Sequence, residues 1–450
     1  MIPSSDATLA GWGNTAPSRA TLKRPRSASE VAEIISGSSN HLIARGLGRS
    51  YGDPAQSAGG TVIDNRGLVQ RSTIDPETGV ISLGAGVSLD ELLRESIPAG
   101  YFVPVTPGTR QVTVGGAIAA DIHGKNHHVD GSFMNHIESM SVVTPTGTFT
   151  TSPTQDAELF WATAGGMGLT GVVIEAKLRL MPIETSYVLV DTERFDNLDA
   201  LMEEMVTGDH RYRYSVAWVD CMTKGARLGR GVLTRGDHAT ADQIDLTKPR
   251  LEAPGAPKLS IPFTAPKGLL NKFSIAAFNE AWFRKAPKRK DAEVQSLSTF
   301  FHPLDGVSMW NRLHGPRGFL QYQFVVPDSA SELVPQAMEL LSSRSVPSFL
   351  AVLKRFGAGN AGLMSFPTAG WTLALDIPVG ASHASSVLDE LDGMVANAGG
   401  RIYLAKDSRL SPHLIPDMYP ELTQFQAICD RVDPNHRFAS DLSRRLNLRG

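Results

Sequence analysis

Residues 41 to 56, HLIARGLGRSYGDPAQ, combine three closely spaced glycines with two arginines. Gly46, Gly48 and Gly52 let the backbone turn tightly and approach a ligand, and successive N–H groups in such a loop can bind phosphate oxygens. The spacing G-x-G-x-x-x-G matches neither the dinucleotide fingerprint nor a P-loop, which requires G-K-[ST]. Taken alone, the loop predicts a pyrophosphate site and a tight structural turn about equally well.

Lys406 lies near the C-terminal end in YLAKDSR, directly after a short apolar stretch. A free lysine titrates near about pH 10.4 and is a poor base at neutral pH, but burial lowers its pKa and makes general-base catalysis feasible. The local pattern by itself favours a surface lysine that pairs with Asp407. The assignment of Lys406 as a base therefore depends on what the fold packs around it.

The segment IHGKNHH contains His123, Lys125, His127 and His128. His123 and His127 are four residues apart, which is a zinc-binding spacing when both lie on one helix. Gly124 interrupts the segment and no thiolate is near, so we expect no metal site. Two interpretations stay open: polar loop residues that hydrogen-bond locally, or side chains that line a ligand site.

Composition sets broad limits. The chain has 450 residues, 42% of them hydrophobic and 20% charged, with a formal net charge of −3. This length fits about two or three domains, and no global positive charge draws the chain to nucleic acid. Cys221 and Cys429 are far apart, so we expect no disulfide framework. We also expect no signal peptide and no transmembrane helix, because neither pattern occurs.

Three glycine-rich segments, 41–56, 102–128 and 160–180, lie within the first 180 residues and indicate one ligand-binding domain there. From about residue 187, strand patterns alternate with helical ones and indicate an antiparallel sheet covered by helices. The fold class is therefore α+β. A Pro-, Lys- and Gly-rich stretch at 246–268 is predicted to be a mobile loop. The predicted division is 1–186, 187–399 and 400–450.

Three motifs in order carry a family resemblance: R-G-x-G-R-S-Y-G-D, P-G-T-x-x-x-T-V-G-G-A and A-G-G-M-G-L-T-G. Together they resemble the vanillyl-alcohol-oxidase type of FAD-binding domain, also called the PCMH type. GRSYGD, ADIHGKNHH, LKRFG and IYLAKDSR further resemble the oxidase subunits of decaprenylphosphoryl-β-D-ribose 2-epimerases over essentially the whole chain. The resemblance implies a two-subdomain FAD domain, a substrate domain, and a C-terminal segment that returns to the FAD domain with the catalytic lysine.

The resemblance also implies a reaction. FAD-dependent oxidation of the 2-hydroxyl of decaprenylphosphoryl-β-D-ribose would give the 2-keto intermediate. An NADH-dependent keto-reductase partner would complete epimerisation to decaprenylphosphoryl-arabinose for cell-wall arabinan. The expected location is the periplasmic side of the envelope, with the cytoplasmic membrane face as the alternative. Two other readings are a soluble aldonolactone or alditol oxidase of the same fold and a non-catalytic FAD-binding scaffold.

Site residues follow from the matched motifs. The resemblance implies Lys406, Tyr51 and His123 as catalytic residues. Many relatives attach FAD through a histidine at the position of Arg49, so noncovalent FAD is expected here. The implied cofactor-binding residues are Arg45, Gly46, Leu47, Gly48, Arg49, Ser50, Tyr51, Gly52, Asp53, Gly108, Thr109, Thr113, Val114, Gly115, Gly116, Ala120, Asp121, His123, Val173 and Tyr403. The implied substrate-binding residues are Lys125, Gln321, Gln323, Lys354, Thr372, Ala374 and Lys406.

Two of these positions depart from the family pattern. Ala374 occupies a place where members often carry cysteine, and Thr372 one where asparagine is usual.

Residues 267–290, KGLLNKFSIAAFNEAWFRKAPKRK, join an apolar helical stripe to a basic end. The stripe comprises Leu270, Phe273, Ala277 and either Trp282 or Phe283. Such a segment can rest on a membrane surface that contains anionic lipid. The pattern alone favours a helix that packs on the substrate domain with a solvated basic tail.

Overall fold

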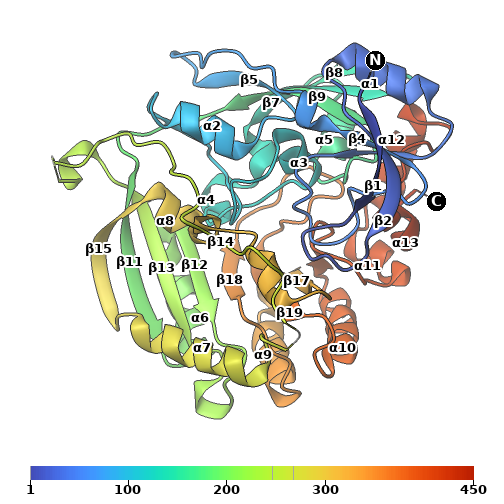
Figure 1. Cartoon of the computed structure of the whole chain (residues 1–450). Coiled ribbons are helices and arrows are strands. Elements are labelled where there is room, and N and C mark those ends of the chain that lie inside the picture. The colour runs from blue at the N-terminus through green and yellow to red at the C-terminus, as the bar shows by residue number, and fades with distance from the viewer. Residues whose placement is uncertain (1, 246, 267, 450) are drawn as a thin grey trace.

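The N-terminal part of the chain builds two four-stranded sheets (Figure 1). The computed structural model describes residues 2–245, 247–266 and 268–449. The first sheet has the order β1-β2-β4-β3, and its strands are β1 (Ser4–Leu9), β2 (Ser18–Lys23), β4 (Thr61–Asp64) and β3 (Leu42–Arg45). The second has the order β5-β9-β7-β8, and its strands are β5 (Val80–Gly84), β9 (Val172–Arg179), β7 (Ile137–Thr144) and β8 (Gly147–Thr151). Strand β3 leads directly into the first glycine-rich loop.

Short capped helices bring the other glycine-rich segments toward that loop. Ser88 and Glu91 form a capping box at the start of α2 (Leu89–Ser96). Thr113 caps α3 (Val114–Ala119) by accepting a hydrogen bond from the N–H of Gly116. The remaining helices of this part are α1 (Ala28–Gly37), α4 (His127–Asp130) and α5 (Ala157–Thr163).

One eight-stranded antiparallel sheet forms the second half of the molecule. Its order is β15-β11-β13-β12-β18-β19-β17-β20. The strands are β15 (Arg289–Ser296), β11 (Tyr187–Phe195), β13 (Gly231–His238), β12 (Tyr214–Val219), β18 (Ala351–Phe356), β19 (Gly370–Pro378), β17 (Phe319–Val326) and β20 (Arg401–Ile402). The helices are α6 (Leu198–Gly208), α7 (Lys272–Lys285), α8 (Leu297–Phe301), α9 (Leu333–Ser343) and α10 (Ala384–Asn397). Helix α6 packs on β11 and β13, and α10 packs on β17 and β20. The α+β prediction is confirmed.

Smaller strand pairs join segments outside these sheets. Strand β6 (Tyr101–Phe102) pairs with β10 (Met181–Pro182), and β14 (Leu259–Ser260) pairs in parallel with β16 (Val307–Ser308). The predicted mobility of 246–268 stays a prediction, and residues 246 and 267 lie outside the described part. Across the described residues, no helix has both the length and the apolar content needed to cross a bilayer.

The C-terminal segment completes the large sheet and then returns to the first part of the chain. Strand β20 pairs with β17, and the following helices are α11 (Ile415–Met418), α12 (Leu422–Val432) and α13 (Asp441–Leu446). Helix α12 packs on α5, and Phe438 packs with Val31 and Leu42 in a small core beneath α1. The end of the chain therefore fastens two regions that are distant in sequence.

Arg445 on α13 forms the ion pairs of this contact between the end of the chain and the first part. Its guanidinium contacts Asp53 in the first glycine-rich loop at 2.8 Å and Asp407 beside Lys406 at 2.9 Å. Both carboxylates are buried, with side-chain exposures of 9% and 2%. The pKa of Arg445 is raised by these two carboxylates, which outweigh the opposing effect of its own burial.

We expect Arg445→Met to lower the free energy of unfolding by about 2 to 3 kcal/mol, because it leaves two buried carboxylates without their cation. Urea unfolding measures this. Arg431→Met is the matched control: Arg431 is half exposed and pairs with Glu158 and Asp156 at the surface. Its loss is expected to cost less than about 1 kcal/mol. Equal losses in the two variants would contradict a special role for Arg445.

Candidate active site

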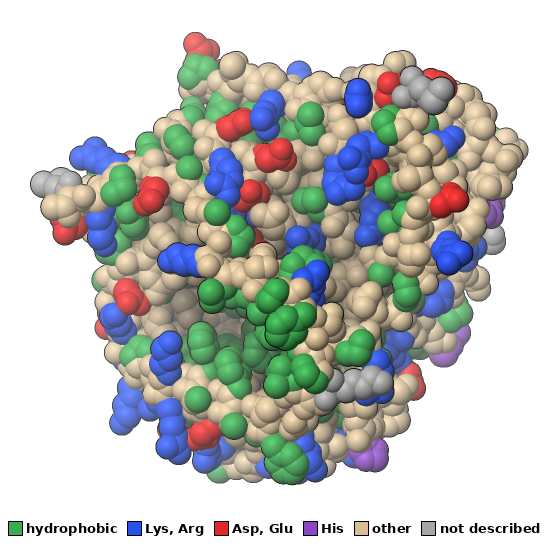
Figure 2. All heavy atoms as spheres, viewed as in Figure 1, with side chains coloured by type: hydrophobic (Ala, Val, Ile, Leu, Met, Phe, Trp, Pro, Cys, Tyr) green, Lys and Arg blue, Asp and Glu red, His purple; other side chains and the backbone are tan. Residues whose placement is uncertain are grey.

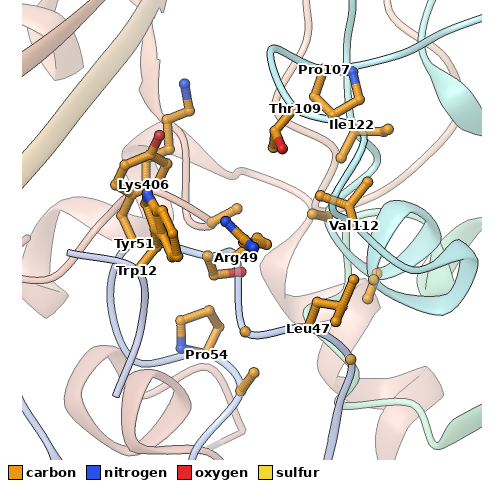
Figure 3. Close-up of a pocket in the computed structure, with 18 of the residues that line it drawn as sticks. Trp12, Leu47, Arg49, Tyr51, Pro54, Pro107, Thr109, Val112, Ile122 and Lys406 are labelled. Atoms are coloured by element: carbon orange, nitrogen blue, oxygen red, sulfur yellow. The ribbon is translucent and has the colours of Figure 1, made fainter. Parts of the chain in front are cut away.

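A cavity of about 300 Å³ lies where the glycine-rich loops face the large sheet. Figure 3 shows Trp12, Tyr51 and Lys406 on one side of it and Pro107, Thr109, Val112 and Ile122 on the other. The predicted residues that line it are Arg45, Gly46, Leu47, Gly48, Arg49, Ser50, Tyr51, Gly108, Thr109, Thr113, Gly115, Gly116, Ala120, His123, Val173, Gln321, Gln323, Lys354, Ala374, Tyr403 and Lys406. The fold thus gathers most of the predicted site around one space.

The first glycine-rich loop presents its backbone to this cavity. In the described part of the chain, the N–H groups of residues 46 to 50 have no protein acceptor. The loop is fixed from outside: the N–H of Trp12 donates to Ser50 O at 2.8 Å, and the N–H of Tyr51 donates to Ala405 O at 2.9 Å. Five free N–H groups in a fixed loop form a nest for the oxygens of a phosphate or pyrophosphate.

Arg45 and Gly48 shape that loop. The Arg45 guanidinium donates to the carbonyls of Ala10 and Ala55, at 2.7 and 3.0 Å. Gly48 has φ +65°, and a Cβ there would lie 2.2 Å from the Arg45 guanidinium. Arg45 therefore holds the loop in place. Glycine is required at position 48 because a Cβ there would clash with the Arg45 guanidinium.

The second glycine-rich segment leaves open space for a ligand. A Cβ on Gly108 would meet no atom within 4 Å, and one on Gly116 would meet only Thr113 Oγ1. By contrast, a Cβ on Gly46 would lie 2.1 Å from the same Thr113 oxygen, so the two loops touch there. Free N–H groups on one loop and unfilled space beside the other fit a dinucleotide such as FAD.

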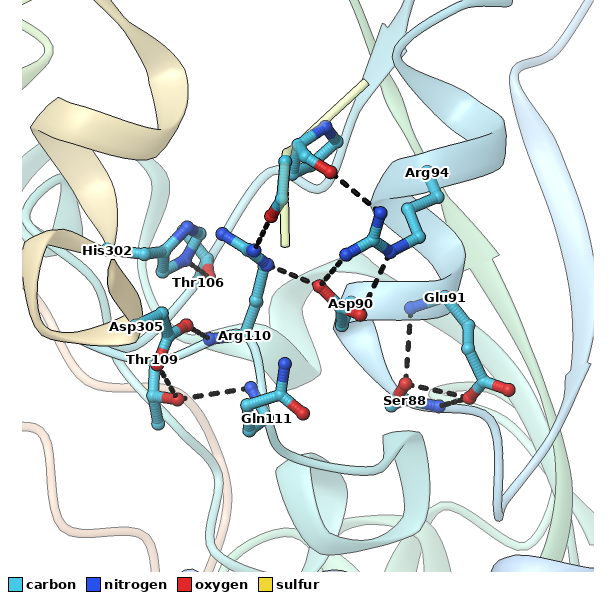
Figure 4. A network of polar contacts seen from close by, with 12 residues as sticks. Ser88, Asp90, Glu91, Arg94, Thr106, Thr109, Arg110, Gln111, His302 and Asp305 are labelled. Carbon is cyan, nitrogen blue, oxygen red and sulfur yellow. Dashed lines mark hydrogen bonds and ion pairs between the residues drawn. The ribbon is translucent and has the colours of Figure 1, made fainter. Parts of the chain in front are cut away.

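A polar network holds the second segment against the substrate half of the molecule (Figure 4). Asp305 accepts hydrogen bonds from Thr109 Oγ1 at 2.6 Å and from the N–H of Arg110 at 2.8 Å. The Arg110 side chain contacts Asp90 and donates to Gly255 O. Thr109 is thus fixed in the cavity wall by a carboxylate from the other half.

Lys406 enters the cavity beside two tyrosines. Its Nζ lies 5.8 Å from the ring centroid of Tyr51 and 5.9 Å from that of Tyr403. Burial lowers the pKa of Lys406 to about 8, although the nearby carboxylate of Asp376 opposes that change. Burial raises the pKa of Tyr51, so its hydroxyl stays protonated. Lys406 can therefore lose its proton near neutral pH and act as a base.

His123 links two other predicted residues. The Lys354 Nζ lies 3.2 Å from His123 Nδ1, and Gln323 Nε2 lies 3.1 Å from His123 Nε2. Burial and the neighbouring Lys354 keep the pKa of His123 well below its ordinary value, so the ring is neutral. Gln323 Nε2 also donates to Thr372 Oγ1 at 2.8 Å, and its Oε1 has no partner within the described part of the chain. The side chains around His123 therefore offer a ligand both hydrogen-bond donors and acceptors.

Six predicted residues lie outside the cavity lining. A Cβ on Gly52 would lie 1.9 Å from Asp407 O, and Asp53 pairs with Arg445. Val114 is a core residue, and Asp121 accepts hydrogen bonds from Ser132 and Ser365. These four residues support the loops from behind.

The other two, Lys125 and Thr372, are proposed substrate residues. The Lys125 Nζ donates to Phe300 O and lies 4.1 Å from the centroid of the Phe300 ring. Burial lowers the pKa of Lys125 to about 7. Thr372 is fully buried between Gln323 and Phe324 O. Among the described residues, no group of three or more His, Cys, Asp or Glu side chains is placed to hold a metal ion.

Sequence reasoning missed several wall residues, among them Trp12 and Trp310. Their ring centroids are 6.0 Å apart, and the Arg49 guanidinium lies 3.9 Å from the Trp12 centroid. The sequence did offer one signal for Trp12: a glycine lies on each side of it, which permits close packing of this segment. A Cβ on Gly11 would lie 2.1 Å from Gly52 O, so this segment packs closely on the first loop.

Fold and cavity together define an FAD-dependent oxidoreductase, and the comparisons agree. Residues 20–152 match the FAD binding domain family. The chain is 42% identical, over 99% of both chains, to decaprenylphosphoryl-β-D-ribose oxidase of Mycolicibacterium smegmatis. It is 22% identical to L-gulono-1,4-lactone dehydrogenase of Mycobacterium tuberculosis, over 94% of this chain and 95% of that one. The chain belongs to the decaprenylphosphoryl-β-D-ribose oxidase family, as its motifs predicted.

Noncovalent attachment of FAD stays a prediction, which acid precipitation of the purified yellow protein tests. Arg49, which the resemblance matches to the linking histidine of many relatives, lines the cavity, and both cysteines are buried outside the lining. We expect all of the flavin absorbance in the supernatant, with the mass of the precipitated chain matching its sequence. Flavin retained in the pellet, or an added FAD mass, would contradict this.

Proposed function

We propose that this chain oxidises the 2-hydroxyl of decaprenylphosphoryl-β-D-ribose to the 2-keto intermediate. The name of the 42% identical relative supports this substrate. The observation that carries the proposal is a buried lysine, Lys406, in a cavity shared by an FAD cradle and a wall of glutamine and lysine side chains. This oxidation would be the first half of epimerisation to the arabinose lipid used for cell-wall arabinan.

The backbone groups of residues 46 to 50 would hold the pyrophosphate of FAD, and the segment from Gly108 to Gly116 would lie along the rest of the cofactor. When bound, FAD supplies a hydride acceptor. Lys406 then takes the hydroxyl proton of the substrate on its neutral Nζ. Tyr51 and Tyr403 exclude water on two sides of that amine and keep it from being solvated.

The sugar would meet acceptor atoms on the sheet wall. Gln321 and Gln323 are two residues apart on β17, so their side chains lie on one face. Both are buried, and the Oε1 of each has no partner among the described residues. Two free acceptors fit the hydroxyl groups of a furanose. Lys354 beside His123 would bind the phosphate, and Ala374 between the strands leaves room for the ring.

The rate of flavin bleaching by a prenyl-phosphoribose should rise with pH and level off above about pH 8, since only neutral Lys406 accepts a proton. Lys406→Met should lower the plateau rate at least about a hundredfold, the contribution of a general base, while FAD stays bound. Anaerobic stopped-flow absorbance measures both. The control is Lys177→Met at an exposed position of β9, outside the cavity lining, with an unchanged rate.

A wild-type protein that bleaches with an aldonolactone or alditol, and not with the lipid sugar, would contradict the substrate. It would favour the soluble oxidase reading, which the gulonolactone dehydrogenase relative makes concrete. If the flavin bleaches with none of these substrates, the result would favour the non-catalytic FAD-binding scaffold.

The lipid substrate would require contact with a membrane, and the surface around α7 supports this part of the proposal. Phe273, Phe278 and Trp282 are 75%, 40% and 45% exposed, whereas Ile275, Asn279 and Phe283 form the buried side of the helix. Of the predicted stripe, Phe273, Ala277 and Trp282 are exposed and Leu270 is half-buried, while Phe283, the alternative to Trp282, is buried. Figure 2 shows hydrophobic side chains around a hollow between α7 and β14.

The basic end of the segment lies next to this surface. Lys285, Lys288, Arg289 and Lys290 are exposed, although Arg289 pairs with Asp291 and Lys290 with Glu293. Helix α7 ends at Lys285, and β15 begins at Arg289. We propose that aromatic and basic groups together rest on anionic lipid at the periplasmic face of the cell envelope. The keto product would pass there to an NADH-dependent keto-reductase partner.

Phe273→Ser combined with Trp282→Ser should weaken binding to vesicles of anionic phospholipid at least about tenfold, because both side chains would leave the interface. Cosedimentation with the vesicles measures this. Val69→Ser combined with Val129→Ser is the matched control, since these side chains are 45% and 56% exposed on other surfaces. Unchanged binding of the aromatic variant would contradict the membrane role of α7.

A further inference from the structure

A chain of hydrogen bonds crosses the sheet wall from a backbone carbonyl to Lys354. Thr372 Oγ1 donates to Phe324 O at 2.8 Å. Gln323 Nε2 lies 2.8 Å from Thr372 Oγ1 and 3.1 Å from His123 Nε2. His123 Nδ1 in turn lies 3.2 Å from Lys354 Nζ. Because Gln323, Thr372 and Lys354 come from the neighbouring strands β17, β19 and β18, and His123 from the second glycine-rich segment, the chain joins both halves of the molecule at the cavity.

The geometry gives the hydrogens of this chain one direction. The Thr372 hydroxyl has a single hydrogen, which goes to Phe324 O, so its oxygen accepts from the amide of Gln323. The second amide hydrogen of Gln323 is left for His123 Nε2, which is then the acceptor nitrogen. A neutral imidazole carries its one proton on the other nitrogen, so Nδ1–H donates to Lys354 Nζ. Only a neutral amine can accept that hydrogen, since an ammonium has no free electron pair.

The reverse orientation of the Gln323 amide is unfavourable. In its present place, Oε1 of Gln323 has no partner among the described residues. Turning the amide would put both of its hydrogens there and would remove the donor that Thr372 Oγ1 accepts. Two buried N–H groups without acceptors cost more than one buried oxygen without a donor. The amide therefore keeps Nε2 toward Thr372 and His123.

Lys354 also has no counter-ion in the described part of the chain. Besides the imidazole, its Nζ hydrogen-bonds only to the carbonyl of Gly124, at 3.4 Å. The titratable groups that face it are all basic: Lys406 on the C-terminal turn, Lys125 on the second glycine-rich segment and His127 on α4, which packs on β18. Burial lowers the pKa of Lys354 well below its ordinary value, and Lys406 and Lys125 lower it further. A buried ammonium is unfavourable in such surroundings.

We propose that Thr372 is a positioning residue: through Gln323 and His123 it keeps Lys354 a neutral amine in the free protein, and the phosphate of the lipid substrate binds together with one proton from the solvent. This role rests on the proposed function. The phosphate provides the anion that Lys354 lacks, so the amine takes up the proton and becomes an ammonium. The ammonium and the Nδ1–H of His123 then both donate to phosphate oxygens. The lysine is thus cationic only when an anion is present.

Nitrogen-15 NMR of the FAD-loaded protein, labelled at histidine, tests the direction of the hydrogen bonds without substrate. The ring signals show which nitrogen of a neutral imidazole carries the proton, and His123→Asn identifies the signals of His123. We expect Nδ1–H in the wild type and in Thr372→Ser, which keeps the hydroxyl. In Thr372→Val, Gln323 can turn its Oε1 to the ring, so the Nε2–H form should increase.

Thr151→Val is the matched control, because Thr151 is a buried residue outside the cavity lining whose hydroxyl donates to Met140 O. We expect the signals of His123 to stay unchanged in this variant. An Nε2–H ring in the wild type, no change in Thr372→Val, or an equal change in Thr151→Val would overturn the proposal.

Calorimetry tests the proton. The probe is the 2-deoxy analogue of a short-chain prenyl-phosphoribose, a phosphodiester that lacks the hydroxyl to be oxidised and stays singly charged near neutral pH. Titrations in Mops and in Tris, whose ionisation enthalpies differ, give the number of protons taken up for each ligand bound. We expect about one in the wild type and about none in Lys354→Met. Lys177→Met, at an exposed position of β9, should keep the wild-type value.

The two measurements separate this role of Thr372 and Lys354 from the proposed function. If the analogue does not bind while the ring of His123 carries its proton on Nδ1, the proposed substrate is refuted and the hydrogen-bond chain stands. If the analogue binds without proton uptake, or if Lys354→Met keeps the uptake, the proton role of Lys354 is refuted and the substrate stands.

Discussion

The bridge from Asp53 through Arg445 to Asp407 is the interaction on which the rest of the site depends. It connects the first glycine-rich loop, the turn that carries Lys406 and the last helix of the chain. The hydrogen bond from the N–H of Tyr51 to Ala405 O runs alongside it, and Gly52 lets the two backbones meet. The first glycine-rich loop and Lys406, the proposed base, are therefore joined by direct contacts. A base that must stay within reach of a substrate hydroxyl needs such positioning.

A second constraint is the concentration of lysines in a dry cavity. Burial lowers the pKa of Lys354, with Lys406 and Lys125 as further causes, and burial alone accounts for the lowered pKa of Lys125. These amines therefore hold their protons loosely, and each is balanced differently. Lys354 contacts a neutral histidine, Lys125 contacts the Phe300 carbonyl and ring, and Lys406 faces Asp376. Lys406, the proposed base, is the one of the three whose pKa a carboxylate, that of Asp376, raises against the effect of burial.

Sequence alone predicted the parts of this structure that are local. The glycine spacing predicted either a phosphate-binding loop or a tight turn, and the alternation of Gln321 and Gln323 placed both side chains on one face. Lys406 needed the family motif, because its surroundings come from strands far away in the chain. Arg445 and Asp376 escaped prediction for the same reason: Arg445 is 392 residues from Asp53, and Asp376 is 55 residues from its hydrogen-bond partner Gln321. Contacts of that separation leave no periodic signal.

Some residues lie elsewhere than predicted, and the cause is the same for each. The sequence did not show on which side of the cavity wall, or of a helix, the side chain lies. Thr372 lies behind Gln323, which lines the cavity, whereas Asp121 bonds Ser132 and Ser365, which do not line it. Helix α7 keeps the phenyl ring of Phe273 exposed and buries that of Phe283, a distinction that apolar spacing alone does not make.

The sheet wall itself argues for a hydroxylated ligand. Gln321 and Gln323 line the cavity, and the Oε1 of each is buried without a partner in the described residues. An unsatisfied buried acceptor costs about 1 to 3 kcal/mol, so these atoms need a donor. A ligand with hydroxyl groups supplies such donors, whereas an apolar chain supplies none. The polarity of this wall therefore favours the sugar of the proposed substrate over its lipid chain as the part that lies beside Lys406.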